Sequence, residues 1–191
     1  MKNAKKVIVL ALCAILLVAV SVMGTLAYLT SQAEVKNTFT AGNVTITLKE
    51  KAMNPATGKK VEGADVTALQ DIKLIPGRVV EKEPFITVAE GSENCWLFVK
   101  INNELADAGS IQWANGWSRV GNTDYWAYNT EAKANDVVTV FTSFTCAKTL
   151  DNTALAAFLG KQIQITAYAI QSEGVAQSDA WSALSGQLNL H

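Results

Sequence analysis

Side chains that could carry catalysis are sparse in this 191-residue chain. The only histidine is His191, so the sequence holds no HExxH zinc motif and no histidine-containing catalytic triad. It also lacks the glycine-rich loops that bind phosphates. Acidic residues such as Glu81, Glu83 and Asp107 are scattered, as on a solvated surface. The residue types therefore predict no enzyme, no metal site and no cofactor.

A cluster of aromatic residues is the best candidate for a binding surface. Trp113, Trp117, Tyr125, Trp126 and Tyr128 fall within 16 positions. Aromatic platforms bind sugars or proteins because they bury a large area and carry polar edges. The simpler interpretation is that these rings pack between sheets and cover hairpin ends. Trp113, Trp117 and Trp126 are the candidates if the surface interpretation holds.

The cysteines leave two possibilities. Cys13 lies in the N-terminal apolar segment, which leaves Cys95 and Cys146 in the rest of the chain. In an exported protein these two could form a disulfide that closes a loop of about 50 residues and contributes about 4 kcal/mol in the chain-entropy model. Free thiols buried in a β-core are the alternative. Export favours the bridge slightly.

The N-terminal segment has the order of a secretory signal peptide. A basic start at residues 2–6 precedes an uncharged apolar run at residues 7–22, and small residues follow, among them Thr25 and Ala27. Basic, apolar, then small-x-small is the order that a signal peptidase reads. We expect cleavage between Ala27 and Tyr28.

An uncleaved membrane anchor is the alternative for this segment. No charge occurs between Lys6 and Glu34, and the apolar character continues to Leu29, which approaches the ~20 residues that cross a bilayer. Gly24 and Thr25 interrupt the run where a cleavage motif belongs. In both cases we expect the remainder outside the cell, secreted into the extracellular matrix or held at the cell surface.

Removal of this segment leaves about 164 of the 191 residues, enough for one domain with a proper core. Three of the 16 basic residues go with it, so 13 remain against 17 acidic residues, a net charge of −4. This balance argues against a nucleic-acid partner, which requires clustered Lys and Arg. We divide the chain into a signal at 1–27, an extended segment at 28–42 and a single domain at 43–191.

The domain reads as β-structure with little helix. Runs with period-two alternation or many β-branched residues are typical of strands, and they cover residues 43–48, 79–88, 95–101, 137–146 and 162–170. Many short strands at this spacing predict two packed antiparallel sheets. Two short helices are expected, one within residues 151–159 and one within 178–186.

Two prolines make local predictions. Pro76-Gly77 suits a type II turn, because proline presets φ and glycine accepts a positive φ. Pro84 lies inside the run at 79–88 and cannot donate to a β-ladder, so we expect that strand at a sheet edge or bulged at Pro84.

Several stretches, in order along the chain, resemble the TasA/camelysin family of bacterial exported proteins. The first is Gly-Thr-Leu-Ala-Tyr-Leu-Thr at 24–30, followed by Asn-Thr-Phe-Thr-Ala-Gly-Asn-Val at 37–44. In the family, similar elements end the signal and open the domain, although Leu26 stands where an aromatic residue is usual. Further matching stretches lie at 74–78, 84–88, 167–174 and 180–181.

The resemblance implies a jelly-roll-like antiparallel β-sandwich, processed by a SipW-type signal peptidase, whose relatives build fibres of the biofilm matrix. In such fibres the segment after the cleavage site acts as a donor strand that completes the sheet of the next subunit. The corresponding segment here is Tyr28 to Thr40, with Leu29, Val35 and Phe39 as apolar anchors. A flexible or self-paired N-terminus is the alternative.

Three functional hypotheses follow. The first is a matrix protein whose partners are other copies of itself, the signal peptidase and other matrix components. The second is a monomeric surface module that binds glycan or protein through residues 113–128. The third is proteolysis, because camelysin has been classed as a metallo-endopeptidase. A catalytic zinc normally needs three protein ligands, which this chain does not offer in any recognisable motif.

Overall fold

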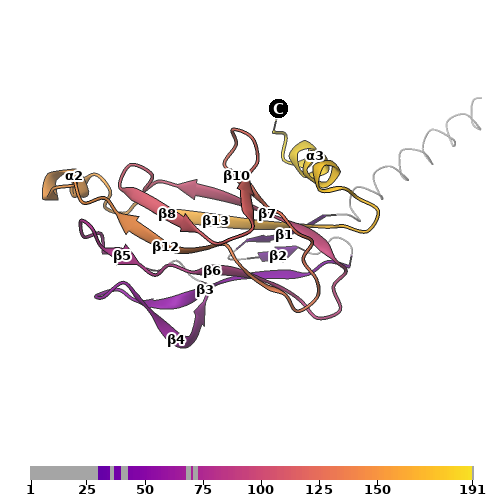
Figure 1. Cartoon of the computed structure of the whole chain (residues 1–191), viewed down its shortest axis with the longest axis horizontal. Coiled ribbons are helices and arrows are strands. Elements are labelled where there is room, and N and C mark those ends of the chain that lie inside the picture. Colours follow the sequence, from indigo (N-terminus) through magenta and orange to yellow (C-terminus); the bar gives the residue numbers. More distant parts are fainter. Residues whose placement is uncertain (1–29, 35–36, 40–42, 68–69, 71–72, 191) are drawn as a thin grey trace, which may run out of the picture.

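The chain folds into a β-sandwich-like structure with two short helices among the described residues (Figure 1). The structure is a computed structural model, and it describes residues 30–34, 37–39, 43–67, 70 and 73–190. Every pairing between its strands is antiparallel. The all-β, two-layered expectation is therefore confirmed at this level.

The largest sheet has six strands. Their order across the sheet is β2 (Asn37–Phe39), β1 (Thr30–Glu34), β13 (Ile163–Gln171), β7 (Cys95–Asn103), β10 (Tyr125–Tyr128) and β9 (Trp117–Arg119). The strands β7 and β13 are nine residues long and pair along their whole length. Two of the runs expected from sequence, 95–101 and 162–170, are these strands.

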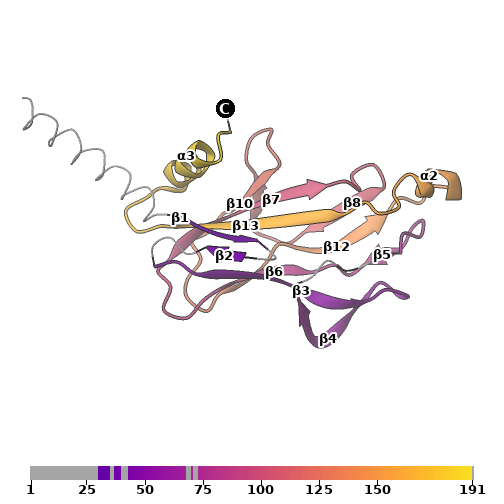
Figure 2. The same cartoon turned by 180° about the vertical axis from the view of Figure 1, so that it is seen from behind.

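Two smaller sheets face the inner side of the six-stranded sheet (Figure 2). One has the order β11 (Val137–Thr139), β6 (Pro84–Val88), β3 (Ile46–Asn54) and β4 (Lys59–Val66); the other has the order β5 (Val79–Val80), β12 (Phe141–Cys146) and β8 (Gly109–Trp113). The main core lies between the layers. It buries Ile46, Ile86, Leu97, Val99 and Phe144 completely.

The outer side of the six-stranded sheet has its own cover. Helix α3 (Gln177–Gln187) lies over it and contributes Ala180 and Leu184 to a second core with Phe98 and Tyr168. Strand β7 thus alternates between the two cores, with Leu97 in the first and Phe98 in the second. The expectation that this strand is covered on both faces is confirmed.

The run at 137–146 is two strands rather than one. It leaves the β6 sheet at Thr139 and enters the β8 sheet at Phe141. Between them, the N–H of Val140 donates to the carbonyl of Pro84 at 2.8 Å. This continuous stretch of chain, β11 followed directly by β12, joins the two small sheets into one layer.

The outcome differs between the two prolines. The N–H of Arg78 donates to the carbonyl of Ile75 at 2.9 Å and Gly77 has φ of +76°, as the predicted turn at Pro76-Gly77 requires. The prediction for Pro84 is wrong, because β6 lies between β11 and β3 rather than at an edge. Pro84 is tolerated there as the first residue of the strand.

The run at 79–88, expected as one strand, is likewise two, because β5 and β6 lie in different sheets. The expectations for α2 and for residues 43–48 hold. Helix α2 (Asn152–Ala156) starts at Asp151, whose carboxylate accepts from the N–H of Ala154 at 2.8 Å. Alternation at 43–48 is confirmed too, because Val44, Ile46 and Leu48 are all buried. The period-two pattern therefore located the core face of that strand correctly.

Gly109 in β8 is a tight point of the fold. A Cβ at this position would lie 2.2 Å from the carbonyl oxygen of Thr145 and 2.6 Å from the Phe144 ring. We expect Gly109→Ala to lower the free energy of unfolding by about 2–3 kcal/mol, as overpacking does, measured by urea denaturation. Gly186→Ala is the control, since nothing lies within 4 Å of its Cβ position in α3; equal effects of the two changes would contradict this account.

Candidate functional site

The edge of β13 is covered by the N-terminal part of the chain. Strand β1 pairs with β13 from Thr30 opposite Ile170 to Ala33 opposite Ala167. The chain then reverses, and β2 pairs with β1, with Phe39 opposite Gln32. The β1–β2 hairpin therefore covers this edge from within the same chain. This arrangement matches the self-paired alternative considered from sequence.

The coverage of that edge is incomplete in the described part of the chain. On one side β7 pairs with all nine residues of β13, whereas β1 pairs with only the four residues from Ala167 to Ile170. Residues 163–166 therefore have β7 on one side and no described strand on the other. A bare stretch of strand edge is a template for further pairing.

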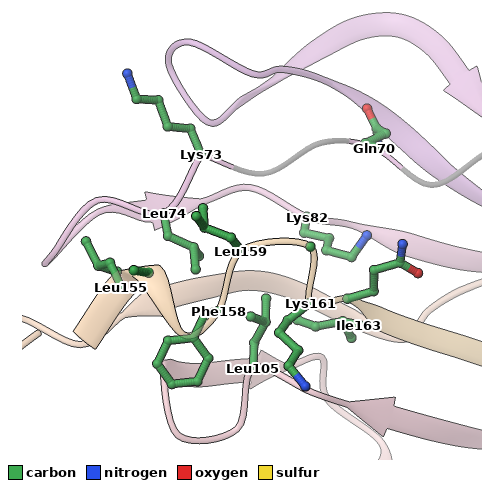
Figure 3. A pocket seen from close by; sticks show the side chains of 13 residues that line it. Gln70, Lys73, Leu74, Lys82, Leu105, Leu155, Phe158, Leu159, Lys161 and Ile163 are labelled. Atoms are coloured by element: carbon green, nitrogen blue, oxygen red, sulfur yellow. The ribbon is translucent and has the colours of Figure 1, made fainter. Parts of the chain in front are cut away.

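A hollow of about 570 Å³ adjoins the start of β13. We call it the α2 hollow, because α2 and the segment after it form one wall (Figure 3). Its apolar lining consists mainly of Leu74, Leu105, Leu155, Phe158, Leu159 and Ile163. Leu159 is 81% exposed, so a large apolar side chain faces solvent at this hollow.

The lysines around the α2 hollow do not make it an anion site. Lys82 is only 3% exposed and donates to both carboxylate oxygens of Glu50, at 2.6 and 2.7 Å. Its charge is therefore already compensated. The side chain of Lys73 extends away from the apolar lining (Figure 3). The hollow consequently suits an apolar group.

The aromatic cluster divides into buried and accessible rings. Trp117 is buried, and its Nε1–H donates to the carbonyl of Thr139 at 2.9 Å. Trp113 and Trp126 are half-buried, stack with ring centroids 3.6 Å apart, and line a second hollow of about 300 Å³. The structure therefore gives Trp117 a packing role, contrary to its place among the surface candidates, and keeps Trp113 and Trp126.

The two cysteines are free and buried, so the bridge favoured from sequence is absent. Cys95 opens β7, whereas Cys146 pairs with Gly109, which follows the far end of β7. Nine residues of strand span roughly 27 Å, and a disulfide needs Cα atoms within about 7 Å. Burial, with a smaller contribution from Glu131 and Asp136, raises the pKa of Cys95 to about 12.

Two of the acidic residues noted from sequence, Glu81 and Glu83, serve as ion-pair partners. The Lys59 ammonium donates to Glu81 at 2.7 Å and lowers the pKa of that carboxyl, and Lys60 lies 3.4 Å from Glu83. Asp107 is exposed. Among the described residues, no group of three His, Cys, Asp or Glu side chains is placed to hold a metal ion.

The remaining sequence candidates lie at the N-terminus. Thr25, Ala27 and Tyr28, the cleavage residues, and the anchors Leu29 and Val35 fall outside the described residues. Phe39 is described as the last residue of β2. Within the described part of the chain, no helix is long and apolar enough to span a bilayer.

The sequence analysis missed the Glu50–Lys82 pair and the α2 hollow. Lys82 stands between Glu81 and Glu83, and a run of three charged residues predicts an exposed side chain rather than a buried one. Comparison with known proteins adds no identification: no family model, no curated protein and no solved structure matches this chain.

The Glu50–Lys82 pair yields a first prediction for this region. Glu50→Gln leaves the ammonium of Lys82 buried without a counter-charge, so we expect the free energy of unfolding to fall by about 3 kcal/mol, measured by urea denaturation. The double variant Glu50→Leu/Lys82→Met should recover most of this loss. Asp65→Asn, which removes the exposed partner of Lys51, should have little effect. If the double variant is no more stable than Glu50→Gln, the uncompensated charge of Lys82 is not the cause of the loss.

The raised pKa of Cys95 predicts a pH dependence. Above the ordinary pKa of 9.0 the thiol loses its proton in the unfolded chain but keeps it in the fold until pH of about 12. Its contribution to stability is therefore complete below pH 9 and is lost between pH 9 and 12, by about 1.4 kcal/mol per pH unit. The difference in unfolding free energy between wild type and Cys95→Ala, measured across this range, should carry that slope; a constant difference would contradict it.

Proposed function

We propose that this protein is an exported structural protein of the extracellular matrix that polymerises by passing its N-terminal strand to the β13 edge of the next copy. The observation that carries the proposal is the pairing of β1 with only part of that edge. A structural role agrees with the sparse catalytic chemistry of the described residues. The motifs shared with the TasA/camelysin family support it further.

Exchange of the strand is physically simple. The contacts between β1 and β13 are made by backbone pairing in a fixed antiparallel register. The same segment of a second copy would form the same pairs, as in domain swapping. Strand addition of this kind takes its affinity from main-chain hydrogen bonds and its specificity from alternate side chains.

A donated strand would pair with more of β13 than β1 does. Within one chain, the segment reverses after Glu34 to form β2. A strand from another copy has no need to reverse. Continued in the same register, it would place Val35 opposite Ile165 and Asn37 opposite Ile163. This extension would cover the bare part of the edge.

The extension also accounts for the α2 hollow. Ile163, Ala167 and Ala169 belong to the main core, and residues directly opposite each other in an antiparallel pair share a face of the sheet. Val35 would therefore add to that core. Two residues beyond Asn37, Phe39 would reach the start of β13, where the hollow offers Leu159 and Phe158. An aromatic anchor in this hollow would bury side chains that are otherwise exposed.

The rest of the proposal follows from the N-terminus. Cleavage after Ala27 by a SipW-type peptidase would free the donor segment, so assembly would occur outside the cell. We also propose a jelly-roll-like topology: the neighbouring positions of β1 and β13, far apart in sequence, fit the long return connection of a Greek key. Other matrix components are further candidate partners.

The test compares filament formation by the chain from Tyr28 with that by variants of donor and acceptor. We expect filaments by negative-stain microscopy from the chain starting at Tyr28 and none from the chain starting at Asn43. Leu159→Asp should block elongation, since it places a charge in the hollow without disturbing a buried position. The control is Val137→Asp, also at an exposed apolar residue (63%). Folded, monomeric protein from the longer chain would overturn the proposal.

A further inference from the structure

A groove lined by tryptophan crosses the seam between two sheets, away from the β13 edge. We call it the tryptophan groove. Its lining includes Trp126 of β10, Arg119 of β9 and Trp113 of the edge strand β8. Ile101 of β7 lines it as well. Its volume of about 300 Å³ lies at the small end of ligand pockets, too small for a helix.

The two indoles are half-buried and held against each other. Their ring centroids are 3.6 Å apart and the planes differ by 23°, so each ring covers one face of the other and fixes its orientation. Phe141 meets Trp113 edge-on from the core side. Neither Nε1–H has an acceptor among the described residues, and neither is among the buried unsatisfied atoms, so both N–H groups reach solvent. Trp117, whose N–H is bound within the protein, provides the contrast.

A fixed polar group stands beside the indoles. Arg119 lies directly opposite Trp126 in the β9–β10 ladder. Its Nε–H donates to the carbonyl of Thr123 at 2.7 Å, and its Nη2 lies 3.7 Å from Asp124. The guanidinium is therefore held beside the Asp124 carboxylate, and both residues line the groove. Since the two charges offset each other, this pair adds no net charge to the groove.

We infer that the tryptophan groove binds a neutral oligosaccharide. The C–H groups of a pyranose ring can pack against the exposed parts of the two half-buried indoles, and its hydroxyls match the indole N–H groups and the Arg119–Asp124 donor and acceptor. A phosphate or nucleic acid would meet the Asp124 carboxylate, and an acyl chain would make no use of the charged pair. A neutral sugar is the ligand class that uses both the rings and the Arg119–Asp124 pair.

The inference is independent of strand exchange, because the groove lies across β7 from the edge that β1 covers. Groove variants should therefore still form filaments if the protein polymerises, and a protein that stays monomeric can still bind sugar. Failure of the polymerisation proposal and failure of the sugar-binding inference can therefore be told apart.

The test is titration of the chain from Tyr28 with chitotetraose, cellotetraose and maltotetraose, followed by calorimetry and by the indole N–H signals in ¹H–¹⁵N spectra. We expect a Kd between about 0.1 and 1 mM for at least one of them. The signals of Trp113 and Trp126 should shift while that of Trp117 stays in place. Trp117 is the internal control, since it belongs to the same cluster but lies outside the groove.

Variants make the test specific. Arg119→Gln and Asp124→Asn should each weaken binding at least about tenfold with an unchanged melting temperature, because both side chains are exposed and such pairs add little stability. Asp65→Asn breaks a comparable exposed pair between β3 and β4 and should leave the affinity unchanged. The inference is overturned if none of the three sugars binds at about 10 mM, or if affinity is the same in Arg119→Gln as in wild type.

Discussion

The pairing of β13 with β7 is the interaction on which the rest of the structure depends. Nine residues of each strand pair in unbroken register, and their side chains point alternately into two separate cores. One core requires the two small sheets, and the other requires α3. Because a strand with both faces buried still has two edges, β13 needs a partner beyond β7. The N-terminal hairpin meets this need only in part.

Under our proposal, this partial coverage lets a stable domain also serve as an assembly unit. A fully paired edge would offer nothing to a second copy, and a bare edge would pair without control. Here the four pairs from Thr30 to Ala33 cover four of the nine residues of β13. The stretch 163–166, which no described strand covers, begins at an apolar hollow in which Leu159 is exposed. Under our proposal, assembly replaces the β1–β13 pairs within one chain by a longer set of pairs between β13 and the donated strand of another copy.

Much of the architecture follows from local patterns in the sequence. Alternation identified the core face at Val44 to Leu48, and Pro76-Gly77 identified its turn, because strand period and backbone φ are properties of neighbouring residues. The short helix within residues 151–159 was predicted in the same way, and the structure places its cap at Asp151. Predictions that depended on a strand's neighbours were less secure: Pro84 proved to open a central strand.

The sequence by itself determined the core face of β3, the turn at Pro76-Gly77, the places of β7 and β13 and the two short helices. Only the tertiary structure decided which residues meet across long separations. It put Cys95 and Cys146 at opposite ends of β7, buried Lys82 against Glu50, and separated Trp117 from the accessible pair Trp113 and Trp126. The reason is physical: alternation records which face of a strand is apolar, whereas contacts between strands depend on sheet order and register.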